Sequence, residues 1–132
     1  MSVIDKLALL LVENRRVLFV RTKGKDLAYT VGGKRKEGES DEQALTREVL
    51  EEVGVHLKPE TIRYLVTFRN QAHGQPEGVM VQLKCFAAEY EGGLEASSEI
   101  AELLWLCGTD KDKTTIPGAM VLDWLKERNL ID

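Results

Sequence analysis

Two apolar runs near the start of the chain, with a polar segment between them, predict the first two strands. The runs are Leu7–Val12 and Val17–Arg21, and the polar segment is Glu13–Arg16. Short apolar runs bounded by turn-forming residues are typical of buried strands. A shorter extended segment, Ala28–Val31, follows and leads into a turn at Gly32-Gly33. We therefore expect two strands joined by a polar turn, and then an extended segment that ends at a pair of glycines.

The charged segment Asp41–Val53 predicts a helix, because both of its ends are marked in the sequence. Ser40 stands at the N-cap, and Gln43 three residues later completes a capping box. Gly54 follows the last helical residue, at the C′ position where a left-handed backbone is common. The apolar residues of the segment recur at helical spacing, so we expect one face of this helix to pack against the sheet.

The second half of the chain predicts three further strands and a closing helix. Its expected elements are strands at Thr61–Phe68, Val79–Tyr90 and Ile100–Leu106, turn-rich segments at Asn70–Gly78 and Gly108–Lys113, and a helix within Ile116–Leu130. Strands on both sides of one helix, closed by a second helix, predict an α/β (α+β) fold with a mixed sheet covered on both faces. With 132 residues and no repeat or linker, we expect one domain over residues 1–132.

Composition and charge restrict the partners and the location of the protein. Hydrophobic residues make up 43 %, which is enough for a core, and the net charge of −4 disfavours duplex nucleic acid and anionic membranes as partners. The run Leu7–Val12 is far shorter than the roughly 20 residues of a membrane span, and it lacks the basic flank of a secretion signal. Cys85 and Cys107 have no metal-binding or redox spacing, so we expect reduced core residues of a cytoplasmic protein.

Three glutamates, Glu48, Glu51 and Glu52, lie within two turns of the first predicted helix. At about 100° per residue, Glu48 and Glu52 share a stripe at the edge of the apolar face, and Glu51 lies on its flank. Repulsion between carboxylates grows near an apolar face. A hard cation such as Mg²⁺ or Mn²⁺ relieves this repulsion and binds substrate phosphates as well. Taken alone, however, the three residues also fit a solvated acidic helix face.

The residues around these glutamates resemble the Nudix box, G-x5-E-x7-R-E-U-x-E-E-x-G-U, where U is a bulky aliphatic residue. The matching positions are Gly33, Glu39, Arg47, Glu48, Val49, Glu51, Glu52, Gly54 and Val55. Every specified position of the box, residues 33–55, is filled, and the chain length and strand order also suit a minimal, MutT-like Nudix domain. The resemblance implies an α/β/α sandwich with a mixed sheet between helices. Val31 stands where many members have proline, so we expect the Gly32 carbonyl to be placed less rigidly.

The resemblance also implies a hydrolase that acts, through Mg²⁺ or Mn²⁺, on a nucleoside diphosphate linked to another moiety. The implied metal ligands are Glu48, Glu51, Glu52 and the Gly32 carbonyl, with catalytic roles for Glu48, Glu52 and Arg47. Arg47 would orient the carboxylates through charge-assisted hydrogen bonds, and Glu39 would support the metal shell through water. Gly33 would let the backbone approach the metal. Bound metals of this kind neutralise phosphate oxygens and activate an attacking water.

A further metal ligand or general base in this family often comes from a later loop, commonly a glutamate shortly before a strand that bears tryptophan. Here Glu99 precedes Trp105, which makes Glu99 the candidate for this role. Glu95 and Glu102 are its rivals. A glutamate in a polar loop is more often merely solvated, so the alternative of a solvated surface stays open.

Cationic residues are candidates for contacts with the substrate phosphates. Arg21 and Lys23 end the second strand, where family members often place such contacts. The basic run Lys34–Lys36 falls at variable positions of the box and is interpreted as a solvated loop. His73 lies in a turn-rich segment, and a lone loop histidine is weak evidence for catalysis.

The substrate expected from the resemblance is a (deoxy)nucleoside triphosphate, cleaved to the monophosphate and pyrophosphate. The marks of ADP-ribose, diadenosine polyphosphate and coenzyme A hydrolases are missing at the expected places. Alternatives are a nucleotide-sugar or ADP-ribose-type diphosphatase and a nucleotide-sensing module that does not cleave its ligand. Isoprenoid diphosphate isomerisation would require a catalytic cysteine motif and a larger chain, and neither Cys85 nor Cys107 lies in such a motif. We expect a small nucleotide as the partner, and a monomer or homodimer as the oligomeric state.

Overall fold

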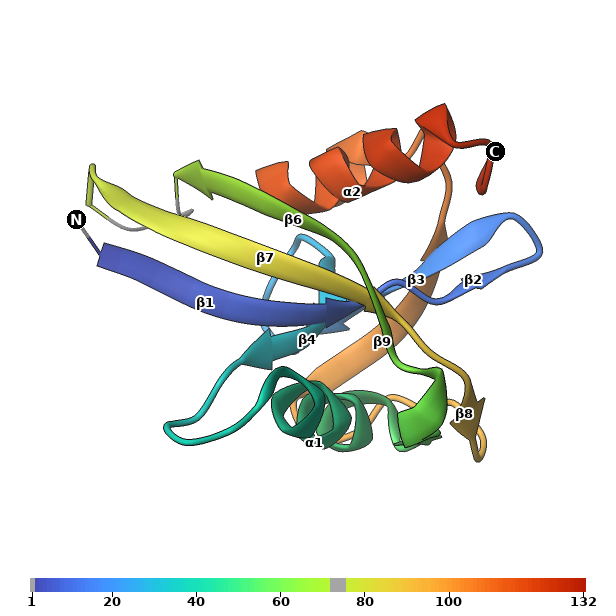
Figure 1. Cartoon of the computed structure of the whole chain (residues 1–132). Helices are drawn as coiled ribbons and strands as arrows, with labels where there is room; N and C mark the ends of the chain where they lie inside the picture. The colour runs from blue at the N-terminus through green and yellow to red at the C-terminus, as the bar shows by residue number, and fades with distance from the viewer. Residues whose placement is uncertain (1, 72–75) are drawn as a thin grey trace.

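A mixed sheet lies between two helices in the computed structural model, which describes residues 2–71 and 76–132 (Figure 1). The strands are β1 (Ser2–Leu9), β2 (Val12–Glu13), β3 (Arg16–Thr22), β4 (Tyr29–Lys34), β5 (His56–Leu57), β6 (Arg63–Gln71), β7 (Val79–Ala87), β8 (Tyr90–Glu91) and β9 (Ile100–Leu106). The helices are α1 (Asp41–Val53) and α2 (Ile116–Glu127), with 3-10 turns η1 (Pro59–Thr61) and η2 (Lys111–Lys113). The predicted fold class is thereby confirmed.

The central sheet has the strand order β2-β3-β4-β1-β7-β6, with β9 paired to the free edge of β3. β1 runs parallel to β7 and antiparallel to β4, which makes the sheet mixed. β3 and β4 pair over a short stretch only, Phe19 with Thr30 and Val20 with Tyr29. The two strands therefore separate beyond this point, and β4 continues alongside β1. A small second sheet joins β5 to β8.

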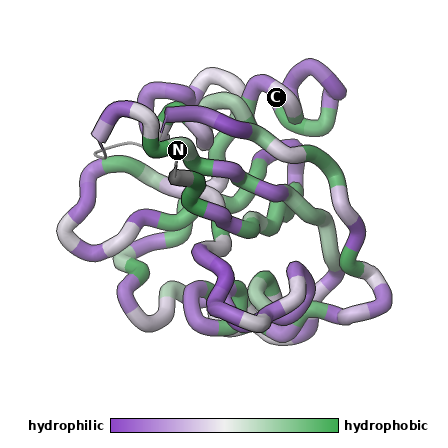
Figure 2. Tube along the Cα trace, turned by 60° about the vertical axis from the view of Figure 1, so that its left-hand side comes forward, coloured by the Kyte–Doolittle hydropathy of each residue, from purple (hydrophilic) through white to green (hydrophobic). Residues whose placement is uncertain are grey.

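The two faces of the sheet bury separate hydrophobic clusters, one beneath each helix. α1 contributes Ala44, Leu45, Val49 and Val53 to one cluster, and α2 contributes Val121, Leu122 and Leu125 to the other. Along β1 and the residue that follows it, Leu7 and Leu9 belong to the α1 cluster whereas Ala8 and Leu10 belong to the α2 cluster, as the alternation of an extended chain requires. Figure 2 shows the apolar and polar stretches along the chain. The run Leu7–Leu11 is apolar throughout, because both faces of the sheet are covered there.

Helix α1 begins and ends where the sequence predicts. The Ser40 hydroxyl accepts a hydrogen bond from the Gln43 backbone N–H at 3.1 Å, and the Gln43 side chain accepts one from the Ser40 N–H at 2.9 Å. Gly54 has a φ of +72° and donates its N–H to the Leu50 carbonyl. Both helix ends are therefore satisfied locally, which fixes the position of the carboxylates on the last two turns.

The first strands differ from the prediction in their boundaries. The expected strand Leu7–Val12 is split, because β1 starts earlier, at Ser2, and ends at Leu9, and β2 begins only at Val12. The charged residues Asp5 and Lys6 lie within β1, and Asp5 is paired to Arg35. The hairpin turn between β2 and β3 uses residues 14 and 15 with positive φ, in agreement with the expected polar turn.

The later elements are shifted by a few residues from their predicted ranges. β6 runs to Gln71, so the predicted turn-rich segment from Asn70 is shorter, and His73 lies outside the described residues. The predicted strand to Tyr90 ends at Ala87, and Tyr90 belongs to β8. The observed helix α2 is shorter at its C-terminus than the predicted range Ile116–Leu130, since it ends at Glu127. β9 has its predicted bounds.

The two cysteines differ in their surroundings. Cys85 is buried in the α2 cluster, as predicted, but Cys107 is only half-buried and corrects the expectation of a core residue. Both are free thiols. No helix in the described part of the chain has the length and apolar character needed to cross a membrane.

Candidate active site

The two glycines before the helix lie within strand β4 and do not form the predicted turn. Gly32 has a φ of +139°, and a Cβ at this position would overlap the carbonyl oxygen of Leu7 on β1. A Cβ on Gly33 would lie 2.6 Å from the carboxylate of Glu48. The strand therefore brings its backbone against the helix carboxylates, and only glycine leaves room for this approach.

Glu52 reaches from α1 to this stretch of backbone. Its Oε1 accepts a hydrogen bond of 2.8 Å from the Gly32 N–H. Burial, reinforced by the charges of Glu48 and Glu51, raises the pKa of Glu52 to about 8, although the Gly32 hydrogen bond acts in the opposite direction. A carboxylate that is costly to ionise in the protein alone is a group that a bound cation would stabilise.

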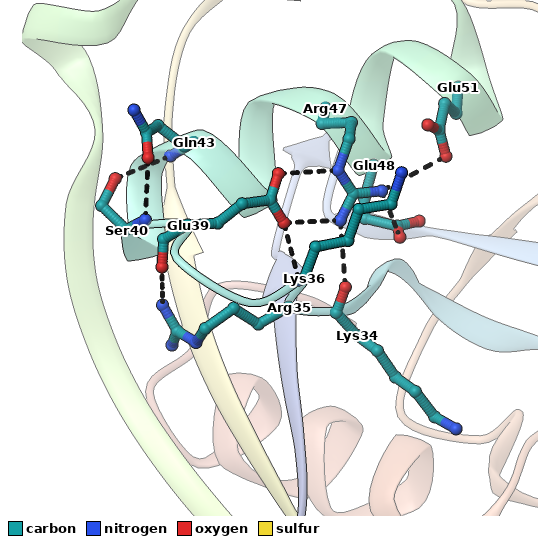
Figure 3. Close-up of polar contacts among 9 residues, drawn as sticks. All are labelled: Lys34, Arg35, Lys36, Glu39, Ser40, Gln43, Arg47, Glu48 and Glu51. Atoms are coloured by element: carbon teal, nitrogen blue, oxygen red, sulfur yellow. Dashed lines mark hydrogen bonds and ion pairs between the residues drawn. The ribbon is translucent and has the colours of Figure 1, made fainter.

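Arg47 holds the neighbouring carboxylates on the outer side of α1 (Figure 3). Its guanidinium contacts Glu48 at 2.9 Å and Glu51 at 3.5 Å, and it donates to the Lys34 carbonyl at 3.1 Å. One planar group thus links α1 to β4 and to two box glutamates. These contacts have the geometry of the predicted orienting role of Arg47.

Glu39 contacts Arg47 and does not reach the other box carboxylates. Its two oxygens accept from Arg47 Nε and NH2, each at 2.8 Å, and Oε1 also accepts from the Lys36 N–H at 2.7 Å. The Arg47 guanidinium lowers the pKa of Glu39 to about 2. The contacts of Glu39 thus position Arg47, and the predicted support of the metal shell through water stays a prediction.

Glu99 lies opposite the box, across a small hollow of about 230 Å³. The hollow is lined by Thr22, Glu48, Glu51, Glu52, Ser98, Glu99 and Ile100. Pairing of β9 with β3 brings this wall into place, because Thr22 is opposite Ile100 in the register. The Lys23 N–H donates to the Glu99 carbonyl at 2.8 Å, and Lys23 Nζ donates to the Ser98 carbonyl at 3.3 Å. The fold therefore brings together the four glutamates that the sequence named.

The rival glutamates lie elsewhere. Glu95 packs beside Gly54 at the end of α1, and its N–H donates to the Val53 carbonyl. Glu102 forms an ion pair of 2.7 Å with Arg21 across the β3–β9 pairing. Arg21 is thus engaged by a carboxylate on the neighbouring strand, and it does not line the hollow. Its predicted contact with substrate phosphates gains no support from this arrangement.

A second, larger cavity of about 370 Å³ adjoins the box on the side of α2, and Glu52 lines both spaces. Its walls combine apolar residues such as Val81, Leu83 and Pro117 with the lysines Lys6, Lys25 and Lys34. The sequence analysis missed Lys6 and assigned Lys34 to a solvated loop. The signal that would have found them is the antiparallel register of β1 and β4, which the spacing of apolar residues does not reveal.

The donor set fits a hard divalent cation. Glu48, Glu51, Glu52 and Glu99 supply the carboxylate oxygens that Mg²⁺ and Mn²⁺ prefer, and the half-buried Glu52 carboxylate lacks a cationic hydrogen-bond donor within the described residues. In the free protein Glu48 and Glu51 are turned to Arg47. Accordingly, within residues 2–71 and 76–132 no three acidic, histidine or cysteine side chains converge on a single point. Metal binding would require rotation of these side chains.

Comparison with known families identifies the class of protein that this arrangement defines. The model of the NUDIX domain matches residues 5–115, and the chain therefore belongs to the NUDIX domain family. The predicted resemblance is thereby confirmed. The chain is accordingly a pyrophosphohydrolase that acts on phosphoric anhydride bonds. Nudix hydrolases generally use divalent metal ions. A comparison with curated proteins finds no match.

Several solved structures share the fold. The solution structure of the E. coli ORF135 protein aligns with a TM-score of 0.71 and 25% identity, over 92% of this chain and 86% of that one. A MutT NUDIX hydrolase from Burkholderia pseudomallei aligns with a TM-score of 0.75 and 19% identity, over 93% and 98%. The E. coli dihydroneopterin triphosphate pyrophosphohydrolase gives a TM-score of 0.72 and 19% identity, over 94% and 97%. These likenesses describe the architecture.

Proposed function

We propose that this enzyme is a Mg²⁺- or Mn²⁺-dependent pyrophosphohydrolase that cleaves a nucleoside diphosphate linked to another moiety. The observation that carries the proposal is the hollow in which Glu99 faces the three box glutamates from the opposite wall. Four carboxylates line this space and no lysine or arginine does, which suits a site completed by divalent cations and the phosphate oxygens bound to them. Every specified glutamate of the box is present, which favours an enzyme over a nucleotide-sensing module.

The chain's own residues divide the work. Glu48, Glu51 and Glu52 would hold the divalent ions, with the Gly32 carbonyl as a further ligand. When bound, such ions neutralise phosphate oxygens and lower the pKa of water. Arg47 holds Glu48 and Glu51 in place, and Glu39 holds Arg47. Glu99, on the facing wall, would accept the proton of the attacking water or supply a further ligand.

We propose a (deoxy)nucleoside triphosphate as the substrate, cleaved to the monophosphate and pyrophosphate. Lys23 supports a phosphate-rich substrate, because its Nζ donates to the carbonyl of Ser98, and Ser98 and Glu99 line the hollow. Proteins of this architecture act on different substrates, as the name of the dihydroneopterin triphosphate pyrophosphohydrolase shows. A nucleotide-sugar or ADP-ribose-type diphosphatase is therefore the alternative that an experiment has to separate.

The test is a panel of nucleoside triphosphates, nucleotide sugars and ADP-ribose, each incubated with the enzyme and Mg²⁺ or Mn²⁺. Chromatography resolves the products, and hydrolysis in ¹⁸O-labelled water locates the attacked atom. We expect nucleoside monophosphate and pyrophosphate from a triphosphate, with the label on a phosphate-containing product. Orthophosphate as the first product, or release of free base, would contradict the proposal. Binding without turnover across the whole panel would instead support a sensing module.

A further inference from the structure

Two lysines lie directly opposite one another on neighbouring strands at the mouth of the larger cavity. Lys6 on β1 is the antiparallel partner of Lys34 on β4, and both line the cavity together with Lys25. Like charges directly opposite on an antiparallel pair are destabilising, since the two side chains leave the same face at close range. Figure 3 shows the Lys34 side chain extending away from the Arg47 cluster. The strand pairing thus concentrates positive charge at one point of the cavity wall.

Neither ammonium has an ion-pair partner among the residues that the structure describes. Other lysines do, since Lys84, Lys111 and Lys113 each pair with an aspartate at 2.8 to 3.1 Å. Lys6 is also half-buried, and its burial and the charge of Lys34 lower its pKa, whereas Glu52 and Glu48 act in the opposite direction. The cavity wall therefore carries one half-buried and one exposed ammonium group, and the protein's own carboxylates do not neutralise either by contact within the described residues.

The lysine pair does not belong to the hollow that would hold the scissile diphosphate. Lys6 and Lys34 line the larger cavity only, whereas Glu48, Glu51 and Glu99 line the hollow only. Glu52 borders both spaces and marks their junction. A substrate whose diphosphate lies over the glutamates would therefore place its remaining moiety in the larger cavity, against the lysines. The apolar residues of that cavity supply a floor for the body of this moiety.

We propose that Lys6 and Lys34 form an anion-binding subsite, so that the enzyme prefers nucleotides whose nucleoside carries a second negative charge, such as a phosphate ester, over the unsubstituted (deoxy)nucleoside triphosphate. This inference rests on the proposed function, because it uses the position of the diphosphate over the box glutamates. An anionic group between the two ammonium groups would remove their mutual repulsion and gain charge-assisted hydrogen bonds in a partly desolvated space. Substrates with an uncharged moiety would leave that repulsion in place.

The experiment measures binding of two reaction-product analogues, AMP and adenosine 3′,5′-bisphosphate, by calorimetry in the presence of Mg²⁺. They differ only in the second phosphate, and neither contains an anhydride bond, so the result does not depend on hydrolysis. We expect the bisphosphate to bind about tenfold or more tightly than AMP to the wild-type enzyme. Lys6→Gln and Lys34→Gln should each remove most of this preference and leave AMP affinity nearly unchanged.

Lys58→Gln is the matched control, because Lys58 carries the same charge and pairs with Glu89 outside the cavity. It should retain the preference for the bisphosphate. A second readout covers folding, since loss of one lysine of the pair should leave the melting temperature of the free protein unchanged or raise it. Equal binding of the two ligands by the wild type would overturn the proposal. Equal weakening of both ligands in the lysine variants would overturn it as well, because the lysines would then hold the shared 5′-phosphate.

Failure of this inference and failure of the proposed function give different results. If the nucleotide panel shows hydrolysis but the bisphosphate gains nothing over AMP, the pyrophosphohydrolase assignment stands and the anion subsite is wrong. If the bisphosphate binds through Lys6 and Lys34 but neither a panel member nor a 3′-phosphorylated nucleoside triphosphate is cleaved, the subsite stands as a binding site and the proposed function is wrong.

Discussion

The backbone N–H of Gly32 donates a hydrogen bond of 2.8 Å to Oε1 of Glu52, which connects the middle of β4 to the last turn of α1. No other hydrogen bond to the Glu52 carboxylate is found within the described residues. A half-buried carboxylate with one neutral donor and two further carboxylates nearby is costly to keep ionised. The geometry of Gly32 and Glu52 is therefore suited to a site that a bound cation completes.

Glu52→Gln should nearly abolish hydrolysis and stabilise the metal-free protein at alkaline pH. The pKa of Glu52 is raised to about 8 from an ordinary value of 4.5, so its ionisation opposes folding and stability is lost as the pH rises through this range. Glutamine does not ionise and can still accept from Gly32. We expect a gain of roughly 1–3 kcal/mol at pH 8 and almost none near pH 4.5. Urea denaturation of the wild type and the variant, with a chelator at both pH values, measures this difference in the free energy of unfolding.

The control for that variant is Glu42→Gln, which makes the same chemical change at an exposed position in the first turn of α1. It should leave activity unchanged and show no comparable pH-dependent gain. Wild-type turnover of Glu52→Gln at saturating Mg²⁺ would show that Glu52 is not a metal ligand.

Glu99→Gln should lower kcat by roughly 10²–10⁴, the range for a positioned proton acceptor. The reason is its place on the wall of the hollow that faces Glu48, Glu51 and Glu52. Steady-state kinetics at saturating metal separate this effect from weaker metal binding. The matched variants Glu95→Gln and Glu102→Gln should change kcat little. Glu95 packs at the end of α1, and Glu102 pairs with Arg21 across the β3–β9 pairing. Equal, small effects at all three positions would place the general base within the box.

Arg47→Lys should raise the metal concentration needed for half-maximal activity by about tenfold and leave the fold intact. Lysine keeps the charge but cannot form the planar fork that contacts Glu39 and Glu48 together. Glu48 would then lose its orientation while keeping its chemistry, so excess Mn²⁺ should restore much of the rate. Arg63→Lys on the exposed edge of β6 is the control. No recovery at high metal would indicate a role for Arg47 other than positioning.

The sequence predicted α1 and β9 with their observed bounds because their signals are local. A capping box, a C′ glycine and a short, mostly apolar segment act within a few positions of the chain. The ends of β1 and β4 were missed because their causes are distant in sequence. Asp5 is accommodated in β1 through its pairing with Arg35, and β4 continues through Gly32 because glycine alone fits beside the carbonyl of Leu7 at a φ of +139°.

The same division holds for the candidate site. The box residues were found by spacing along one helix, whereas the partners of Arg21, Lys6 and Lys34 depend on strand register. Arg21 was expected to contact phosphate, but β9 places Glu102 opposite it. Register is fixed by side-chain contacts across the whole sheet, and a single apolar pattern does not encode it residue by residue.

The two thiols should differ in reactivity with iodoacetamide at pH 8. Burial raises the pKa of Cys85 to about 12, so its thiolate is scarce and also inaccessible. Cys107 is half-buried. We expect one carbamidomethyl group per native chain, located at Cys107 by mass spectrometry, and a second at Cys85 only after unfolding. Rapid double labelling of the native protein would show that the α2 cluster does not protect Cys85.

The parallel pairing of β1 with β7 has a consequence for the order in which the chain folds during its synthesis on the ribosome. β1, β3, β4 and α1 are synthesised first, and the three box glutamates emerge with them. β7 must follow before β1 gains its second neighbour, and β9 later still before Glu99 faces the box. The four carboxylates therefore come together late in synthesis, when β9 pairs with β3 in a sheet whose central strands are already paired. The electrostatic repulsion among Glu48, Glu51, Glu52 and Glu99 therefore reaches its full strength only after the strands that hold them have paired.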